Sequence, residues 1–143
     1  MMDEYGSQGL EMGIKRVGEI MSRDVETIST EAYVIEVIKR MFDKKVGSVL
    51  VVEDEKPLGI VSERDLVNKL YIRGDNPVSV KVTDIMTRDP VTVQPDESIL
   101  DAAALMQEGG FRRLPVVEQD KLVGFLTQAD LLKALISRVS MLE

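Results

Sequence analysis

Two short stretches combine a small hydroxyl residue and an aspartate at the same spacing. GIVSERDL, residues 59–66, contains Ser62 and Asp65, and GFLTQADL, residues 124–131, contains Thr127 and Asp130. One interpretation is a capping box, in which the hydroxyl bonds a free amide of the first helical turn and the acid reaches back. A helix N-terminus also attracts phosphate, and the nearby aspartate could accept hydrogen bonds from both hydroxyls of a ribose. The two interpretations use the same geometry, so both stay open.

The two stretches belong to a tandem duplication. When the chain is aligned with itself at an offset of 65 residues, residues 17–68 match residues 82–133 without a gap, and 14 of the 52 pairs are identical. Most other pairs exchange one apolar residue for another. A half of roughly 60 residues is marginally stable alone, so we expect the two halves to share a core.

The expected secondary structure repeats with the sequence. The apolar periodicity and the turn residues predict the order β-α-β-β-α in each half, an α/β (α+β) fold. In the first half the expected elements are a strand over 25–28, a helix over 33–41, strands over 48–52 and 57–61, and a helix over 63–71. In the second half they are a strand over 91–93, a helix over 97–107, strands over 113–117 and 122–126, and a helix over 128–140.

The domain organisation follows from the repeat and from the breaker residues. Gly74, Asp75, Asn76 and Pro77 interrupt the pattern between the halves. We therefore divide the chain into a flexible lead-in over 1–13, a first repeat over 14–73, a linker over 74–79 and a second repeat over 80–143.

The composition excludes several classes of function. The chain has neither cysteine nor histidine, which removes thiolate metal sites, disulfides and imidazole bases. No pair of carboxylates has the spacing of an acid-base dyad, so we expect no catalytic residues, no metal ligands and no enzyme activity. A formal net charge of −7 argues against binding a nucleic-acid backbone. No apolar run approaches the ~18 residues that span a bilayer, and no leader is evident, so we expect a cytoplasmic protein without a membrane association.

The repeated motifs resemble those of a known family. The segments V-x-x-I-M-[ST]-R-D at 17–24 and 82–89 open the halves, and the two stretches with the hydroxyl and the aspartate close them. Together they resemble a tandem pair of CBS domains, often called a Bateman module, over roughly residues 14–138. The resemblance implies two βαββα repeats packed with pseudo-two-fold symmetry, as a stand-alone module. Many such pairs regulate other proteins and bind adenosine compounds in the cleft between the repeats.

The resemblance also implies two sets of binding residues, because one repeat usually supplies the ribose and phosphate contacts and the other the adenine pocket. The first set is Val25, Val46, Gly47, Arg113, Thr127 and Asp130. The mirror set is Ser62, Arg64, Asp65, Pro90, Val91, Phe111 and Arg112. Arginine suits phosphate because its planar fork makes two charge-assisted hydrogen bonds. The alternative for all three arginines is a solvated surface position.

We therefore expect a regulatory module that senses an adenosine ligand, such as AMP, ADP, ATP or S-adenosylmethionine, and signals to an unknown partner protein. No further cofactor is required. The alternative is a ligand-free protein-interaction or assembly module in which both motifs are only helix caps. Helices over 33–42 and 131–142 carry apolar residues on more than one face, which predicts a homodimer joined through them.

Overall fold

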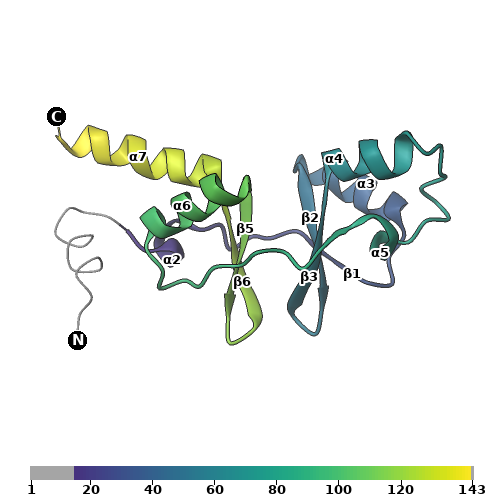
Figure 1. Ribbon diagram of the computed structural model, residues 1–143, viewed down its shortest axis with the longest axis horizontal. Helices are drawn as coiled ribbons and strands as arrows, with labels where there is room; N and C mark the ends of the chain where they lie inside the picture. The colour runs from purple at the N-terminus through teal and green to yellow at the C-terminus, as the bar shows by residue number, and fades with distance from the viewer. Residues whose placement is uncertain (1–14, 143) are drawn as a thin grey trace. The chain divides into compact units, whose positions relative to one another are not determined.

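The computed structural model describes residues 15–142 (Figure 1). The lead-in predicted over 1–13 lies outside the described residues. The described chain forms two compact units, a central unit of residues 25–90 and a C-terminal unit of residues 15–24 and 91–142. These units differ from the sequence repeats. The opening segment of the first repeat lies in the C-terminal unit, and that of the second repeat lies in the central unit.

The central unit is built on a four-stranded sheet. Its strands, in spatial order, are β1 (Thr27–Ser29), β2 (Ser48–Glu53), β3 (Lys56–Ser62) and β4 (Thr87–Arg88). β1 runs parallel to β2, and the other two pairs are antiparallel. One side of the sheet carries α3 (Val34–Lys44), α4 (Glu63–Leu66), the π-helical turn η1 (Val67–Tyr71) that continues α4, and α5 (Val82–Ile85) (Figure 1).

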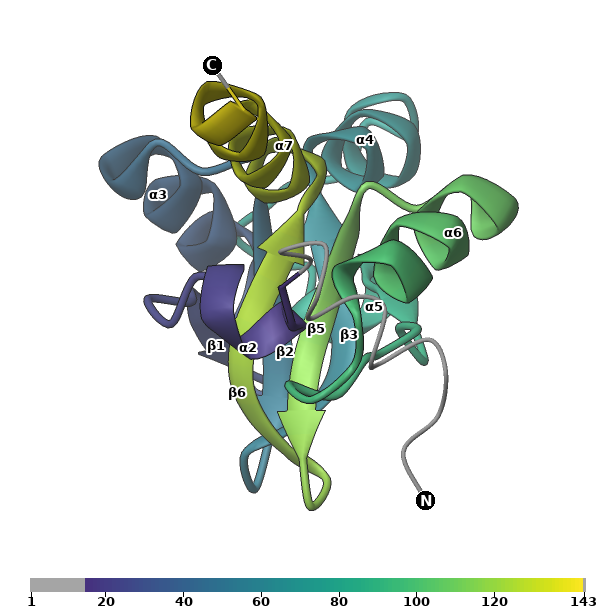
Figure 2. The same cartoon turned by 90° about the vertical axis from the view of Figure 1, so that its left-hand side faces the viewer.

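The C-terminal unit is built on an antiparallel hairpin of β5 (Arg113–Glu118) and β6 (Lys121–Thr127). Three helices lie on one side of this hairpin (Figure 2): α2 (Val17–Ile20), α6 (Ile99–Gly109) and α7 (Gln128–Leu142). The β5–β6 register reproduces that of β2–β3 with the offset of 65 residues, including the irregularity between the two central valines. The duplication is therefore visible as two equivalent hairpins.

The strand predicted over 91–93 is wrong, whereas the other predicted strands and the four predicted helices are confirmed to within a few residues. Val93 makes only an isolated parallel bridge to Val116. In the central unit the Leu50 amide donates to the Glu26 carbonyl at 3.0 Å, which extends the pairing of the first strand. The position equivalent to Leu50 is Pro115. Proline has no amide hydrogen, so the equivalent bond to Val91 cannot form.

Three short elements were not predicted: α2, α5 and β4. The helices α2 and α5 arise from the V-x-x-I-M segments, whose apolar residues lie three and four positions apart and so share one face of a helical turn. The strand β4 directly follows the second of these segments. Val17 and Val82 are completely buried. Burial of one valine side chain contributes roughly 1.5–3 kcal/mol, which holds each short helix in place despite its length.

Each unit has its own apolar core, and the two repeats share both of these cores, as the sequence predicted that they would share one. The central core combines residues of the first repeat with Val82, Ile85 and Met86 of the second. The C-terminal core combines residues of the second repeat with Val17 and Met21 of the first. The repeats are thus joined through exchanged opening segments, each of which completes the core of the other repeat.

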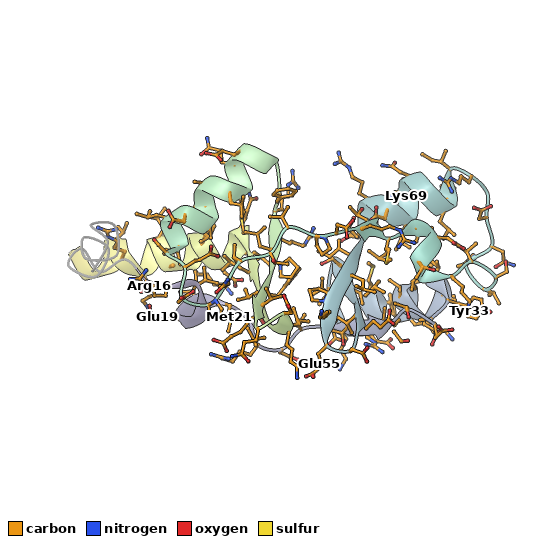
Figure 3. The ribbon with its side chains drawn as sticks, turned by 60° about the horizontal axis from the view of Figure 1, so that its bottom comes forward. Arg16, Glu19, Met21, Tyr33, Glu55 and Lys69 are labelled. Carbon is orange, nitrogen blue, oxygen red and sulfur yellow. The ribbon has the colours of Figure 1, made fainter. Side chains whose placement is uncertain are left out.

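Gly59 and Gly124, which begin the two repeated stretches, permit this exchange. A Cβ at Gly59 would overlap the Met86 side chain and lie 3.1 Å from the Thr87 carbonyl oxygen. A Cβ at Gly124 would overlap Met21, labelled in Figure 3, and lie 3.0 Å from the Ser22 carbonyl oxygen. Both glycines are therefore needed for the close approach of an opening segment to a strand.

Within residues 15–142, no helix combines the length and the apolar character needed to cross a membrane.

Candidate functional site

In the C-terminal unit, Thr127 and Asp130 form the capping box at the start of α7. The Thr127 amide donates to Asp130 Oδ2 at 2.8 Å, and the Asp130 amide donates to Thr127 Oγ1 at 3.2 Å. Both residues are half-buried. The structural interpretation of the motif is therefore confirmed, and both side chains keep part of their surface exposed.

Two arginines lie beside this capping box. Arg113 is directly opposite Thr127 in the β5–β6 register, and the Gln128 amide donates to the Arg112 carbonyl at 3.1 Å. Arg113 is half-buried and Arg112 is exposed. The fold thus brings Arg113, Thr127 and Asp130 together at one end of the hairpin, as a cation, a hydroxyl and a carboxylate near a helix N-terminus.

The central unit contains the equivalent capping box at the start of α4. The Ser62 amide donates to Asp65 Oδ2 at 2.9 Å, and the Asp65 amide donates to Ser62 Oγ at 3.3 Å. The Glu63 amide donates to the Gly47 carbonyl at 3.1 Å. Arg64 is exposed on the first turn of α4, and the residue opposite Ser62 in the hairpin is Ser48, where the other unit has an arginine.

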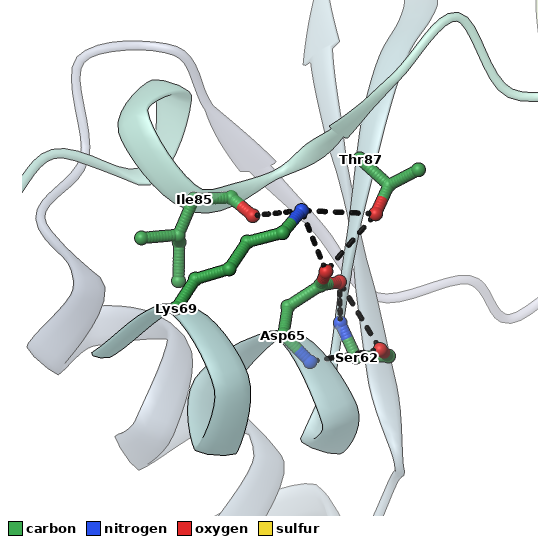
Figure 4. A network of polar contacts seen from close by, with 5 residues as sticks. All are labelled: Ser62, Asp65, Lys69, Ile85 and Thr87. Atoms are coloured by element: carbon green, nitrogen blue, oxygen red, sulfur yellow. Dashed lines mark hydrogen bonds and ion pairs between the residues drawn. The ribbon is translucent and has the colours of Figure 1, made fainter. Parts of the chain in front are cut away.

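Asp65 takes part in a further network that sequence reasoning missed (Figure 4). Its Oδ1 atom forms an ion pair with Lys69 Nζ at 3.0 Å and accepts from Thr87 Oγ1 at 3.0 Å. Lys69 Nζ also donates to the Ile85 carbonyl at 3.2 Å. The network joins the α4–η1 helix to the opening segment of the second repeat. The spacing of Asp65 and Lys69, four residues on a helix, was an available signal for the ion pair.

The remaining predicted residues are divided between the units. Val25, Val46 and Pro90 are half-buried in the central unit, where Val46 packs against the core. In the C-terminal unit Phe111 packs against the core, whereas Val91 is 37% exposed. The grouping of Val25, Val46 and Gly47 with residues of the other unit into one site stays a prediction, as does that of the mirror set.

The rest of the described chain offers weaker candidates for a site. Among residues 15–142, no group of three or more acidic side chains is arranged to hold a metal ion. A depression beside β1 is lined mainly by polar residues, among them Glu31, Glu36, Arg40 and Asp54. The Arg40 guanidinium already donates to the Thr27 carbonyl at 2.6 Å. The acidic lining of this depression is unsuited to phosphate. The end of the β5–β6 hairpin that carries Arg113 and Thr127 therefore remains the stronger candidate.

Comparison with known proteins agrees with this architecture. The family model of the CBS domain matches residues 17–72 and 82–137. An uncharacterised protein of Methanopyrus kandleri is 41% identical over 119 residues, which cover 82% of this chain and 61% of that protein. The chain therefore spans about three fifths of the length of this relative.

Two solved structures resemble the fold. The structure of CBSX2 in complex with AMP has a TM-score of 0.74 and 32% sequence identity, covering 86% of this chain and 97% of the other. A hexameric CBS-CP12 protein from bloom-forming cyanobacteria has a TM-score of 0.75 and 32% identity, covering 83% of this chain and 67% of the other.

Proposed function

We propose that this chain, which belongs to the CBS-domain family and carries two of these domains in tandem, binds an adenosine ligand and transmits its presence to a partner protein. The tandem pair is a regulatory module. The proposal has two parts, the ligand and the regulated partner protein. The ligand is AMP, ADP, ATP or a compound of the S-adenosylmethionine type.

The observation that carries the proposal is the grouping of Arg113, Thr127 and Asp130 at the start of α7. The aspartate can accept hydrogen bonds from the two ribose hydroxyls, and the hydroxyl and the arginine can both donate to phosphate. The positive end of the α7 dipole adds to the attraction for an anion. The structure of CBSX2 with AMP supports this choice of ligand class. The adenine contacts that the family resemblance implies for Val25, Val46 and Gly47 stay a prediction within this proposal.

Sensing requires two conformations of the protein that differ in affinity for the ligand. A ligand shifts such an equilibrium only by the difference between its two binding free energies. We propose that the adenosine ligand stabilises one conformation and thereby alters the surface presented to the partner. No residue of the chain takes a catalytic role in this scheme, and no further cofactor is needed.

Thermal unfolding with added ligand tests the proposal. A ligand that binds only the folded state adds about 2.7 kcal/mol of stability at 100 times its dissociation constant, which corresponds to a rise of several degrees in Tm. AMP, ATP and S-adenosylmethionine are each added at millimolar concentration, with inosine monophosphate as the control for the adenine base. No shift with any adenosine compound would contradict the proposal.

A second proposal concerns assembly, because α7 presents a row of exposed apolar side chains. Leu132, Leu135, Ile136 and Val139 are each more than half exposed. A continuous apolar helix face of this kind usually marks an interaction surface. We propose that the chain forms a homodimer through α7 and α3, where Phe42 is also exposed. Oligomerisation in the family is illustrated by the hexameric CBS-CP12 protein.

Light scattering at tens of micromolar tests the assembly. The wild type should have the mass of a dimer, and Ile136→Glu should have the mass of a monomer, because a buried glutamate would lose its hydration. Val78→Glu, at an exposed apolar residue in the segment between the repeats, is the control and should remain dimeric. A monomeric wild type would contradict the proposal. If the protein is a dimer that binds no adenosine compound, the ligand-free assembly module is the better description.

The proposed location is the cytoplasm. The sequence contains no cysteine, so the fold uses no disulfide and is compatible with a reducing compartment.

A further inference from the structure

We propose that Lys69 closes the Ser62–Asp65 motif to ligands, so that each chain has a single adenosine site, at Thr127 and Asp130. This inference rests on the proposed function and adds to it the number of sites and the residue that sets this number.

The Asp65 carboxylate has no free acceptor position. A carboxylate has about four lone-pair directions, two on each oxygen. Oδ1 is used by Lys69 Nζ and Thr87 Oγ1, each at 3.0 Å. Oδ2 is used by the Ser62 amide at 2.9 Å and by Ser62 Oγ at 3.1 Å. The residue is only 6% exposed, so a ribose could reach it only by displacing these donors.

The Asp130 carboxylate is open by comparison. Its Oδ2 atom accepts from the Thr127 amide at 2.8 Å, and within residues 15–142 its Oδ1 atom has no hydrogen bond or ion pair. The side chain is half-buried. It therefore keeps acceptor positions for the two neighbouring hydroxyls of a ribose.

The two hydroxyl groups differ in the same sense. Ser62 Oγ donates its hydrogen to Asp65 Oδ2, so this hydrogen is not available to a phosphate. Thr127 Oγ1 accepts from the Asp130 amide and, in the part of the chain that the structure describes, donates to no other atom. The Thr127 hydroxyl can therefore donate to an anion without breaking an existing bond.

The difference originates in two pairs of equivalent positions. The residue equivalent to Lys69 is Ala134, which has no charge to offer Asp130. The residue equivalent to Thr87 is Ser22, whose hydroxyl donates to the Asp24 carbonyl at 3.5 Å. Lys69 is held in place because it also donates to the Ile85 carbonyl at 3.2 Å. A ribose at Asp65 would have to displace the Lys69 ammonium, which would replace an ion pair with hydrogen bonds from uncharged hydroxyls and leave the ammonium without its carboxylate.

Calorimetric titration with AMP tests the number of sites. The wild type should bind one AMP per chain. Asp130→Asn should weaken this binding at least about tenfold, because the ribose hydroxyls lose a charged acceptor. Ala134→Lys places a lysine beside the open motif, as Lys69 lies beside the closed one, and should lower the affinity for AMP by a similar factor. Ala134→Met adds volume without charge and should bind AMP with the affinity of the wild type. Two AMP sites per wild-type chain, or unchanged binding in Ala134→Lys, would overturn the proposal.

The pairing of Lys69 with Asp65 is tested without any ligand. In a double-mutant cycle, Lys69→Met should lower the folding equilibrium constant about fivefold more in the wild-type background than in the Asp65→Asn background. Absence of this coupling would overturn the closure by Lys69 while leaving AMP binding intact. Absence of AMP binding to the wild type, with the coupling present, would instead refute the proposed function, so the two failures are distinguishable.

Discussion

The two units repeat one hairpin, but the polar groups of the central unit are satisfied internally to a greater extent. In the central unit, β1 and β4 extend the hairpin to four strands, and Lys69 ties Asp65 to the segment that carries Thr87. In the C-terminal unit, the equivalent segments make only isolated bridges, from Ser22 to Phe125 and from Val93 to Val116.

Two differences between equivalent positions contribute to this contrast. Pro115, in place of Leu50, removes one ladder hydrogen bond, and Ala134, in place of Lys69, removes the ion pair. The unit without these internal contacts is also the one with an arginine opposite its capping hydroxyl. After a duplication, one copy of a motif can thus acquire internal partners, while the other keeps polar groups that have none within residues 15–142.

The largest expected effect is a difference between the two aspartates. Asp65→Ala should lower the free energy of unfolding by about 3 kcal/mol, because it removes the cap and leaves the Lys69 ammonium without its carboxylate. Asp130→Ala should cost about 1 kcal/mol, the cost of a cap alone. Urea unfolding followed by circular dichroism measures both. Equal losses would show that the ion pair contributes nothing in solution.

The two arginines should differ in their effect on AMP. Arg113→Ala should reduce the binding free energy of AMP by roughly 1.5–3 kcal/mol and should leave that of adenosine nearly unchanged, because only the nucleotide loses a charge-assisted contact. Arg64→Ala, on the closed motif, is the matched variant and should affect neither ligand. Titration calorimetry with both ligands decides. Equal losses of AMP and adenosine in Arg113→Ala would show that this residue acts through folding.

The two glycines should respond alike, which tests the exchange of opening segments. Gly59→Ala and Gly124→Ala should each cost roughly 1–3 kcal/mol, because the added methyl meets a methionine side chain and a backbone oxygen. Gly74→Ala, where an added Cβ meets nothing within 4 Å, controls for the loss of glycine itself, although its positive φ adds some strain. Thermal unfolding of the three variants ranks their losses of stability. A loss at only one of the two repeated glycines would mean that only one opening segment packs as described.

The smallest expected effect is at the capping hydroxyls. Ser62→Ala and Thr127→Ala should each cost on the order of 1 kcal/mol without ligand, since each removes an acceptor for a first-turn amide. AMP separates them: only Thr127→Ala should reduce the ligand-induced rise in Tm. A reduction in Ser62→Ala of the same size would place the ligand at both motifs.

Local features followed from the sequence because they depend on residues close together along the chain. The capping boxes need only a hydroxyl and an aspartate three residues apart, and both formed. The hairpins followed from apolar runs separated by polar turns, and the structure adds that both hairpins have the same register. The absence of a strand at 91–93 also has a cause in the sequence, namely Pro115, which has no amide hydrogen. This effect could not be predicted locally, because it depends on a pairing between residues that lie 24 positions apart.

The sequence by itself determined the duplication, the family and the two equivalent motifs. Only the tertiary structure decided which opening segment completes which unit, because the segments at 17–24 and 82–89 share five identical residues and local pattern cannot distinguish them. Tertiary packing determines which opening segment completes each unit and therefore which donors surround each aspartate. Asp65 meets Thr87, which lies 22 residues away along the chain, whereas Asp130 has no such donor within the described residues. Hydrogen bonding within one turn follows from spacing, but the saturation of a carboxylate depends on every segment that packs against it.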